Sequence, residues 1–597
     1  MTVESLITQH IDTWTSAVKT KSTTGRGSSK KLELYGVKKL RELILELAVR
    51  GKLVPQDPND EPATVFLKKI ADEKANLIAE KKTRKAKTSQ VSDMPTVKIS
   101  LPSGWALPWV EELVINSSDH IVDGPFGSKL KASEYVDSGV PIIRIQNIDR
   151  NVFKNNGLQF LSPKKADELE RHSFHSGDIV LNKLGEPTGK ACIIPSSLKY
   201  GIIVADIVRI RLDSDHIEKH YLTLAINSPI VAQQFAGLAK GVTRQRVNLS
   251  QIRSLCIPIP PLKEQIKIVS RVDELMALCD QLEQQTEASI EAHQLLVSTL
   301  LNTLTHSADA DELMENWARI SDHFDTLFTT EESIEQLKQT ILQLAVMGKL
   351  VPQDPNDEPA SVLLERIAEE KAQLIKEKKI KKQKALPPIA DDEKPFDLPK
   401  GWEWTTIDNS FYVSGGIQKT PKRTPVKHHF PYLAVANVQR GHLVLDELKR
   451  FEVTTEELER YKLSAGDLMV VEGNGSENEI GRCAIWTEEI SECLHQNHLI
   501  RCRPYIPELS DWVLSSLNSP LGIAIMKSLA VTSSGLYNLS VGKIRGVLVP
   551  LPPLKEQVRI VQKVDELLKL CEQLKCSLSV SQTTQLQLTD AIVEQAV

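Results

Sequence analysis

Two stretches of the chain show the apolar spacing of a long helix. Each follows a pair of prolines, at 260–261 and 552–553, and these mark a turn because proline cannot donate a helical hydrogen bond. Apolar residues then recur at intervals of four and three, the a/d spacing of a short coiled coil. The seam positions are Ile268, Val272, Leu275, Cys279, Leu282, Ile560, Val564, Leu567, Cys571 and Leu574. The first helix is predicted over about 262–306, and two such helices lying antiparallel would form a rigid spacer.

Shorter helical patterns lie upstream of each long one. Leu40, Leu43 and Leu47 keep helical spacing. Gly51 is placed to end the helix, and VPQDPND after it predicts a turn. The stretches 62–87 and 359–384 begin amphipathic and end in lysine-rich tails. Such tails are typical of a solvated helix end or a linker, and contact with DNA is the alternative.

An internal repeat is the most informative feature of the sequence. LAVRGKLVPQDPNDEPA at 47–63 returns as LAVMGKLVPQDPNDEPA at 344–360, and only Arg50 and Met347 differ. Two segments that are almost identical are expected to meet two copies of the same partner.

A second pair of matched segments closes each half of the chain. PIPPLKEQIKIVSRVDEL at 258–275 returns as PLPPLKEQVRIVQKVDEL at 550–567, and LPSGW and LPKGW open the segments that precede them. About 150 residues between these flanks diverge in each half. A shared frame with different surfaces predicts that the two halves read different targets. The alternative is a recent duplication in which the two halves have no separate functions. That alternative does not readily explain why the flanks stay alike while the segments between them diverge.

The diverging parts, residues 96–261 and 396–553, are called here the first and second variable segments. Both carry short apolar runs broken by Gly, Asn and Pro, which predict strands in α/β domains. The runs are VPIIRI, GDIVLN, KACII and IVRIRL in the first segment, and PYLAVANV, GDLMVVE, CAIW and HLIRCR in the second.

The sequence therefore predicts two α/β domains separated by long antiparallel coiled-coil helices, in an internal two-fold repeat. The expected domains are an N-terminal helical region (1–95), the first variable segment (96–261), a central helical region with the spacer (262–395), the second variable segment (396–553) and a C-terminal coiled-coil helix (554–597).

Composition and charge bear on the cellular location of the protein and on the ligands that it could bind. The eight cysteines show no CxxC spacing, which suggests reduced thiols in a cytoplasmic protein. No basic and apolar leader opens the chain, and no apolar run approaches the roughly 18–20 residues of a membrane span. The net charge of -5 does not argue against nucleic acid, because only the contacting face has to be basic.

Three enzyme motifs are incomplete in this chain. GEPTGK at 185–190 has three intervening residues where a phosphate loop has four, and Ala191 stands where Ser or Thr must hold magnesium. A tight turn explains the pair Gly473 and Gly475. DPND at 57–60 lacks the aromatic that stacks on a flipped base in adenine methyltransferases. No catalytic residue is predicted.

A zinc site is also not expected. Cys493, His495, His498 and Cys502 have suitable side chains, but their spacing is not that of a zinc finger. A single strand would send His498 to the face opposite Cys493 and His495. We expect core cysteines, and one or two exposed histidines that are available for phosphate or base contact.

Both halves contain a strip without acidic residues, at 219–263 and 512–555. Such a strip suits a surface that faces phosphates, and Arg244 and Arg246 are its best candidates for contact. A mostly buried segment is the alternative, since apolar residues dominate both strips.

Forked donors and amides read base edges, so we expect arginine, lysine, asparagine and glutamine at the contacts. The candidates for DNA binding are Lys129, Lys131, Arg144, Gln146, Asn147, Lys183, Arg244, Arg246, Lys422, Arg423, Asn437, Gln439, Asn474, Gln496, Asn497, Lys543 and Arg545.

The whole constellation resembles the specificity subunits of type I restriction–modification systems. It consists of LP-x-GW, an α/β variable segment, PPLKEQ and a heptad helix, given twice, and it covers nearly the whole chain. GPFGSKLKASEY (124–135) and HQNH (495–498) also look like pieces of target-recognition domains.

The resemblance implies a non-catalytic subunit that reads a split target in double-stranded DNA. It further implies docking to two methyltransferase subunits, which methylate adenine N6 with S-adenosylmethionine, and through them to two motor–nuclease (restriction/translocase) subunits that use ATP and Mg²⁺. No cofactor is expected in the chain itself. The alternative is a coiled-coil adaptor that organises two protein partners without reading DNA.

Overall fold

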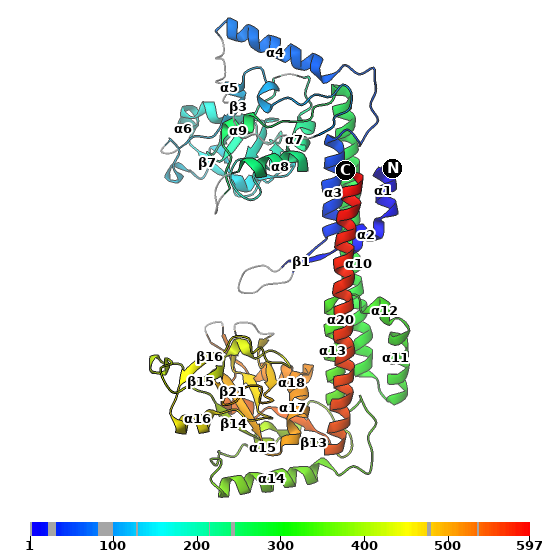
Figure 1. Cartoon of the computed structure of the whole chain (residues 1–597), viewed down its shortest axis with the longest axis vertical. Helices are drawn as coiled ribbons and strands as arrows, with labels where there is room; N and C mark the ends of the chain where they lie inside the picture. Colours follow the sequence, from blue (N-terminus) through cyan, green and yellow to red (C-terminus); the bar gives the residue numbers. More distant parts are fainter. Residues whose placement is uncertain are drawn as a thin grey trace. The chain divides into compact units, whose positions relative to one another are not determined.

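The computed structural model describes residues 3–21, 31–81, 99–126, 129–213, 215–239, 245–474, 479–533 and 536–597. The chain divides into two compact units (Figure 1). Unit 1 comprises Met1–Lys21, Leu32–Glu287 and Gln582–Val597, and unit 2 comprises Ser22–Lys31 and Ala288–Ser581. The boundaries between the two units fall inside predicted domains, within 1–95, 262–395 and 554–597. The division into five domains stays a prediction.

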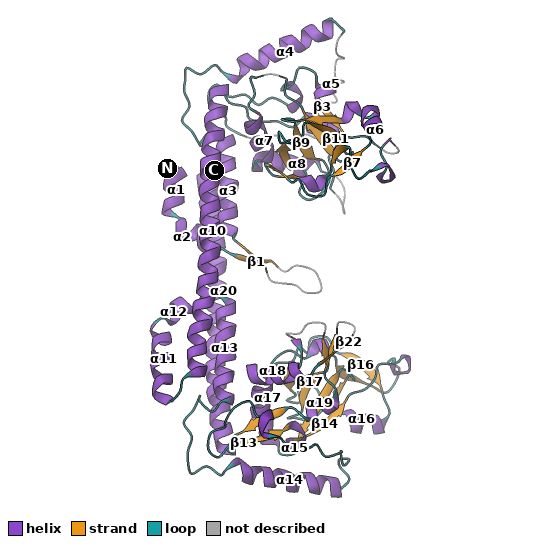
Figure 2. Ribbon diagram, turned by 180° about the vertical axis from the view of Figure 1, so that it is seen from behind, coloured by secondary structure: helices purple, strands orange, loops and turns teal. Residues whose placement is uncertain are grey.

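Two helices dominate the helical part of each unit. α10 runs over Leu262–His306, as the heptad pattern predicts, and α20 over Leu554–Ala596. Each unit contains the beginning of one of these helices and the end of the other, and the two stretches run alongside each other in both views (Figures 1 and 2). The seam positions Ile268, Val272, Leu275, Cys279, Ile560, Val564 and Cys571 are buried, and Leu282, Leu567 and Leu574 are half-buried.

A shorter helix packs on the long ones in each unit. In unit 1, α3 (Tyr35–Val49) donates a hydrogen bond from Tyr35 to Asp590 at 2.7 Å, and its Arg41 pairs with Glu283 at 2.7 Å. In unit 2, α13 (Glu331–Val346) pairs Lys338 with Glu572.

Each unit also contains further helices in its helical part. Unit 1 has α1 (Val3–Gln9), α2 (Ile11–Ser16) and α4 (Ala63–Ala79), and unit 2 has α11 (Ala310–Asp322), α12 (Phe324–Leu327) and α14 (Ala360–Lys376). The short strands β1 (Lys19–Lys21) and β2 (Lys31–Glu33) pair with each other. α14 ends before the lysine-rich tail, whose residues 378–384 form a non-helical linker, while residues 82–98 lie outside the described part.

The first variable segment folds around two four-stranded sheets and a short hairpin. The first sheet has the order β10 (Ala191–Ile193), β9 (Ile179–Asn182), β12 (Ile207–Ile210) and β3 (Ile121–Asp123), all antiparallel. The second has β7 (Gln159–Leu161), β4 (Val140–Ile143), β11 (Tyr200–Ile203) and β8 (Ser173–His175), and its β4–β11 pair is parallel. β5 (Ile148–Asp149) pairs with β6 (Val152–Phe153). The helices are α5 (Ser117–His120), α6 (Pro163–Glu168), α7 (Lys219–Asn227), α8 (Pro229–Leu238) and α9 (Leu249–Arg253).

The second variable segment has the same plan. One sheet has the order β14 (Phe411–Gly415), β21 (Leu499–Pro504), β17 (Leu468–Val471) and β19 (Cys483–Ile485). Another has β16 (Lys449–Glu452), β15 (His429–Leu433) and β20 (Leu494–His495), with β15 and β20 parallel. Two small sheets pair β13 (Glu403–Thr406) with β24 (Leu548–Leu551), and β23 (Leu536–Asn538) with β18 (Gly473–Asn474) and β22 (Val531–Ser533). The helices are α15 (Ile407–Ser410), α16 (Thr455–Tyr461), α17 (Ser510–Asn518), α18 (Pro520–Leu529) and α19 (Val541–Arg545). Every apolar run predicted as a strand forms one.

The matched sequence motifs meet at one junction in each unit. In unit 1, Glu264 of PPLKEQ accepts hydrogen bonds from Trp105 Nε1 at 3.0 Å and from Gln56 Nε2 at 3.1 Å. In unit 2, Glu556 accepts one from Trp402 Nε1 at 3.1 Å. Burial raises the pKa of both carboxyls. The junction thus joins the start of each variable segment to the start of a long helix.

A glycine closes each junction. Gly51 and Gly348 both have positive φ, 67° and 68°. A Cβ at Gly51 would stand 2.4 Å from Pro102 Cγ, and a Cβ at Gly348 would stand 2.5 Å from Pro399 Cγ. Glycine is therefore required at both positions for two reasons, the positive φ and the lack of room for a Cβ atom.

We predict that Gly51→Ala and Gly348→Ala each lower the free energy of unfolding by more than left-handed strain alone, which is about 1–2 kcal/mol. Gly441→Ala is the matched control, because Gly441 also has positive φ but nothing lies within 4 Å of its added Cβ. Chemical denaturation of the three variants measures the difference. Equal losses in all three would contradict the steric argument.

Candidate nucleic-acid interface

Two of the candidate amides support the fold of their own loops. Asn147 is buried, its Oδ1 accepts from Arg144 N at 3.0 Å, and its Nδ2 donates to Lys154 O at 2.9 Å. Asn437 does the same, accepting from Ala434 N at 2.9 Å and donating to Val444 O at 2.8 Å. Both side chains are occupied by main-chain atoms and face away from solvent.

Three further candidates contact the same loops from outside. Arg144 Nη2 and the exposed Gln146 both donate to Gly157 O, at 2.7 and 3.3 Å. Gln439 donates to Ala436 O at 2.8 Å and accepts from Arg482 at 3.0 Å.

Several candidate cations are paired inside the protein. Lys183 is only 2% exposed, pairs with Asp123 at 2.7 Å and lies 4.2 Å from the ring centroid of Phe126. Arg423 makes two hydrogen bonds to Glu457, and these hydrogen bonds lower the pKa of that carboxyl to about 2.

The same holds in the acid-free strip of unit 2. Arg545 pairs with the buried Asp408 at 2.6 Å and donates to Lys384 O at 2.6 Å. Lys543 donates to Leu529 O. Both cations are thus committed to contacts within the fold.

The other candidates differ in exposure. Lys129, Lys131 and Lys422 are exposed, and Gln496 and Asn497 are half-buried in the turn between β20 and β21. The side chain of Arg246 is 50% exposed and pairs with Asp206. Arg244 lies outside the described residues, and of Asn474 only its place in β18 is described.

Burial accounts for much of both acid-free strips. Residues 221–227 of α7 are buried, and Arg253 turns inward to donate to Ser117 O and Ile121 O at 2.8 and 2.7 Å. In unit 2, Trp512 is buried and donates to Pro550 O at 2.8 Å. The buried interpretation therefore holds for these parts of the strips, and Arg246 is exposed within the first strip.

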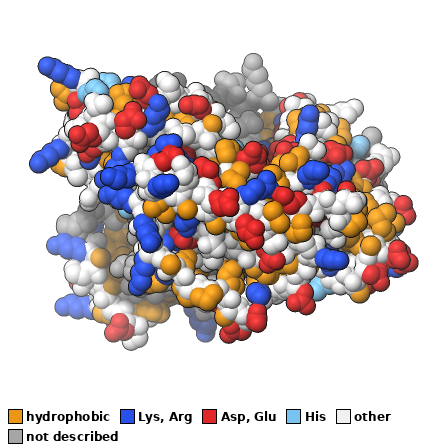
Figure 3. Space-filling model, turned by 90° about the horizontal axis from the view of Figure 1, so that it is seen from below, with side chains coloured by type: hydrophobic (Ala, Val, Ile, Leu, Met, Phe, Trp, Pro, Cys, Tyr) orange, Lys and Arg blue, Asp and Glu red, His pale blue; other side chains and the backbone are white. Residues whose placement is uncertain are grey.

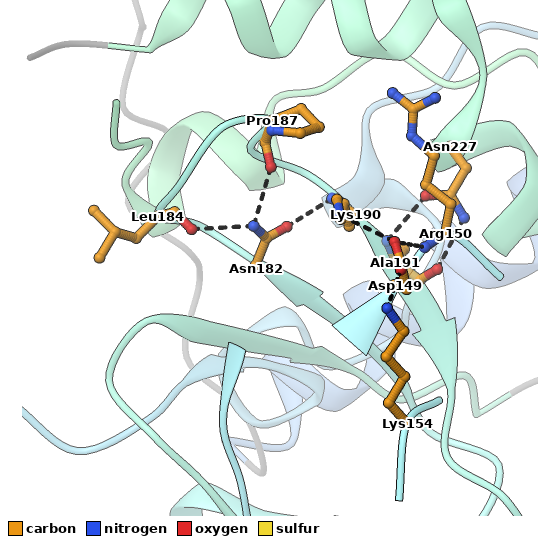
Figure 4. A network of polar contacts seen from close by, with 9 residues as sticks. All are labelled: Asp149, Arg150, Lys154, Asn182, Leu184, Pro187, Lys190, Ala191 and Asn227. Carbon is orange, nitrogen blue, oxygen red and sulfur yellow. Dashed lines mark hydrogen bonds and ion pairs between the residues drawn. The ribbon is translucent and has the colours of Figure 1, made fainter. Parts of the chain in front are cut away.

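A polar network fixes the turn that resembles a phosphate loop (Figure 4). Asn182 donates to Leu184 O and Pro187 O at 3.0 and 3.2 Å, and it accepts from Lys190 N at 2.7 Å. Lys190 pairs with Asp149 at 3.0 Å. Although burial acts to raise it, hydrogen bonds from the two neighbouring lysines lower the pKa of Asp149 to about 2. The lysine of this turn is thus neutralised internally.

The two cysteines and two histidines of the rejected zinc set have different surroundings in the structure. Cys493 and Cys502 belong to different hydrophobic clusters, and His498 is exposed. His495 is fully buried, which lowers its pKa to about 3 and keeps it neutral. Within the described residues, no group of three or more His, Cys, Asp or Glu side chains is arranged to hold a metal ion.

Sequence reasoning missed two buried arginines that organise the sheets. Arg209 donates to Ser173 O at 2.5 Å, and Arg501 donates to Lys462 O at 2.9 Å. Burial lowers the pKa of both guanidinium groups to about 10. The R-x-R pattern in IVRIRL and HLIRCR is the only sequence signal for them.

On the face drawn in Figure 3, surface charge by itself does not mark an interface. The face in Figure 3 carries Lys and Arg side chains standing among Asp and Glu side chains. Among the helices that the structure describes, none combines the length and the apolar character needed to cross a membrane.

Comparison with known proteins decides the family. The model of the type I restriction modification DNA specificity domain matches residues 126–292. The type I restriction enzyme EcoAI specificity subunit of Escherichia coli is 42% identical over 620 aligned positions, which cover 100% of both chains. The chain belongs to the specificity subunits of type I restriction enzymes.

Two more relatives agree with this family. The EcoEI specificity subunit of Escherichia coli is 41% identical over 612 positions, again with 100% of both chains covered. The EcoKI specificity subunit of Escherichia coli strain K12 is 23% identical, over 78% of this chain and 82% of its own length. The resemblance inferred from the repeated motifs is confirmed.

Proposed function

We propose that this specificity subunit reads a split DNA target, with one half-site for each variable segment. The observation that carries the proposal is the same framework built twice under different surfaces. Asp178 pairs with Arg211 at 2.7 Å in the first variable segment, and Asp467 pairs with Arg503 at 2.6 Å in the second. Equal frames position two surfaces alike, and different surface side chains then select different bases.

The long helices act in this proposal as the spacer between the half-sites. The buried seam at four-three spacing, and the presence in each unit of one helix beginning and one helix end, support an antiparallel coiled coil and an internal two-fold repeat. The length of the DNA between the half-sites then follows the length of the helices.

The exposed apolar residues of these helices support docking of two methyltransferase subunits. Three positions stand the same number of residues beyond each PPLKEQ motif and are about half exposed in both repeats. They are Ile266, Leu278 and Leu296 on α10, and Val558, Leu570 and Leu588 on α20. Each unit contains one residue from each of the three matched positions. These are Ile266, Leu278 and Leu588 in unit 1, and Val558, Leu570 and Leu296 in unit 2. Two equal apolar sets suit two copies of one partner.

The chemistry belongs to the partners in this proposal. S-adenosylmethionine would bind the methyltransferase subunits, and ATP and Mg²⁺ the two motor–nuclease subunits. This chain is assigned no catalytic residue and no cofactor, in keeping with its incomplete enzyme motifs. A cytoplasmic location follows from the same assignment and from cysteines without CxxC spacing.

Methylation mapping tests the reading function. We expect a host that produces this chain with its neighbouring methyltransferase to carry N6-methyladenine in a split motif, seen by long-read sequencing. The motif should disappear when this chain is omitted. An assembled complex that binds S-adenosylmethionine but leaves the genome unmethylated would contradict the proposal and favour the adaptor.

Stoichiometry tests the docking surface. Leu278→Lys should leave one bound methyltransferase subunit in place of two, and Leu278→Lys combined with Leu570→Lys should leave none, as measured by native mass spectrometry. Loss of an apolar anchor at an interface costs roughly tenfold in affinity or more. Ala318→Lys is the control, because it places the same side chain at an exposed position of α11, outside both long helices. Two subunits bound to the double variant would refute this surface.

A further inference from the structure

The two variable segments share a main-chain ladder at the same end of the inner strands of their four-stranded sheets β10-β9-β12-β3 and β14-β21-β17-β19, and this end is called the edge below. In unit 1, Lys183 N donates to Asp206 O at 2.9 Å, and Val247 N donates to Lys183 O at 3.0 Å. In unit 2, Glu472 N donates to His498 O at 3.0 Å, and Leu539 N donates to Glu472 O at 2.6 Å.

This ladder aligns the side chains of the edge one by one. Lys183 corresponds to Glu472, Asp206 to His498, and Arg246, which precedes Val247, to Asn538. The bridge between Leu184 and Arg246 also has its counterpart in the pairing of Gly473 with Asn538. The correspondence therefore rests on hydrogen bonds and not on sequence likeness, which is absent at these positions.

Chemistry changes at every one of these positions. Unit 1 presents Lys183 paired with Asp123, and Arg246 paired with Asp206. Unit 2 presents Glu472 3.7 Å from His498, and an exposed Asn538.

The neighbouring strand continues this divergence. In unit 1, Asp123 pairs with Val208, and Phe126 lies three residues after Asp123. In unit 2, Gly415 pairs with Ile500, and Gln418 lies three residues after Gly415. Both Phe126 and Gln418 are exposed. At the opposite end of the same strands the residues stay alike, since buried Asp178 pairs with Arg211 and buried Asp467 pairs with Arg503. Among the diverging positions, Arg246 and Phe126 are exposed in unit 1, and His498, Asn538 and Gln418 are exposed in unit 2, whereas Lys183 is buried and Glu472 is half-buried.

Arg246 is the side chain of this edge that is best placed to reach a ligand. Its backbone is fixed by the bridge to Leu184 and by the buried Val247 beside it. Its guanidinium is steadied by Asp206 through Nη2, while half of the side-chain surface stays exposed. A pre-oriented fork of donors is what bidentate recognition of guanine O6 and N7 requires.

We propose that this edge is the base-reading surface of each variable segment, with Arg246 reading a guanine of one half-site and Asn538 an adenine of the other. Asp206 is then a positioning residue. The proposal rests on the proposed function and assigns the side chains that make the two half-sites differ. Asparagine suits adenine because its amide can accept from N6 and donate to N7.

Single substitutions test the assignment in the assembled methyltransferase. Arg246→Asn should relax or change one guanine position of one half-site, with at least roughly a tenfold fall in methylation of the original motif, and leave the other half-site unchanged. Asn538→Arg should alter one adenine position of the other half-site only. Lys164→Asn is the matched control, since it removes an exposed cation from α6, and the motif should stay as it was.

Binding supplies a second measurement where methylation is lost altogether. The assembled complex of each variant is titrated against DNA duplexes that carry every single-base change in the half-sites. Lost discrimination at one position supports the assignment, and full discrimination retained at every position overturns it. A wild-type chain that directs no methylation overturns the proposed function itself, whereas a wild-type motif that both variants preserve overturns only the base-reading edge.

Discussion

A buried carboxylate at the foot of each long helix is the constraint on which the architecture depends. Glu264 and Glu556 lie in the interior, where an ionisable group is costly unless it is hydrogen-bonded. The indoles of Trp105 and Trp402 satisfy them, and Gln56 adds a second donor to Glu264. Because the donors come from LP-x-GW and PQDP and the acceptor from PPLKEQ, all three motifs must be kept together. This explains why they recur almost unchanged in both halves.

Such a junction leaves the variable segments free to diverge elsewhere. Their sheets are fixed at one side by the junction and within by pairs such as Asp178 with Arg211. Substitution at the exposed edge then alters surface chemistry at little cost to the frame. Arg246 in the first variable segment and Asn538 in the second are the exposed side chains at matched positions of the same main-chain ladder. Recognition of two different half-sites by one fold becomes possible in this way.

Sequence alone predicted the elements better than the contacts. The heptad pattern located α10 at 262–306, and the apolar runs located the strands, because both signals are local. The burial of Asn147 and the pairing of Arg545 with Asp408 were not predictable, since the partners depend on the folded loops and on residues far along the chain. The acid-free strip pointed to Arg246 as a contact residue, but Asp206 and Asn538 were missed because the ladder that aligns them has no sequence signal.

One frame with two interchangeable reading surfaces is the arrangement that we infer. Its most direct test is a chain in which residues 106–259 are replaced by a second copy of residues 403–551, joined at the conserved tryptophans and PPLKEQ motifs. Long-read methylation mapping with the partner methyltransferase gives the result. We predict a motif in which both half-sites carry the bases that the second variable segment reads. A motif that keeps the original pair of different half-sites would contradict it.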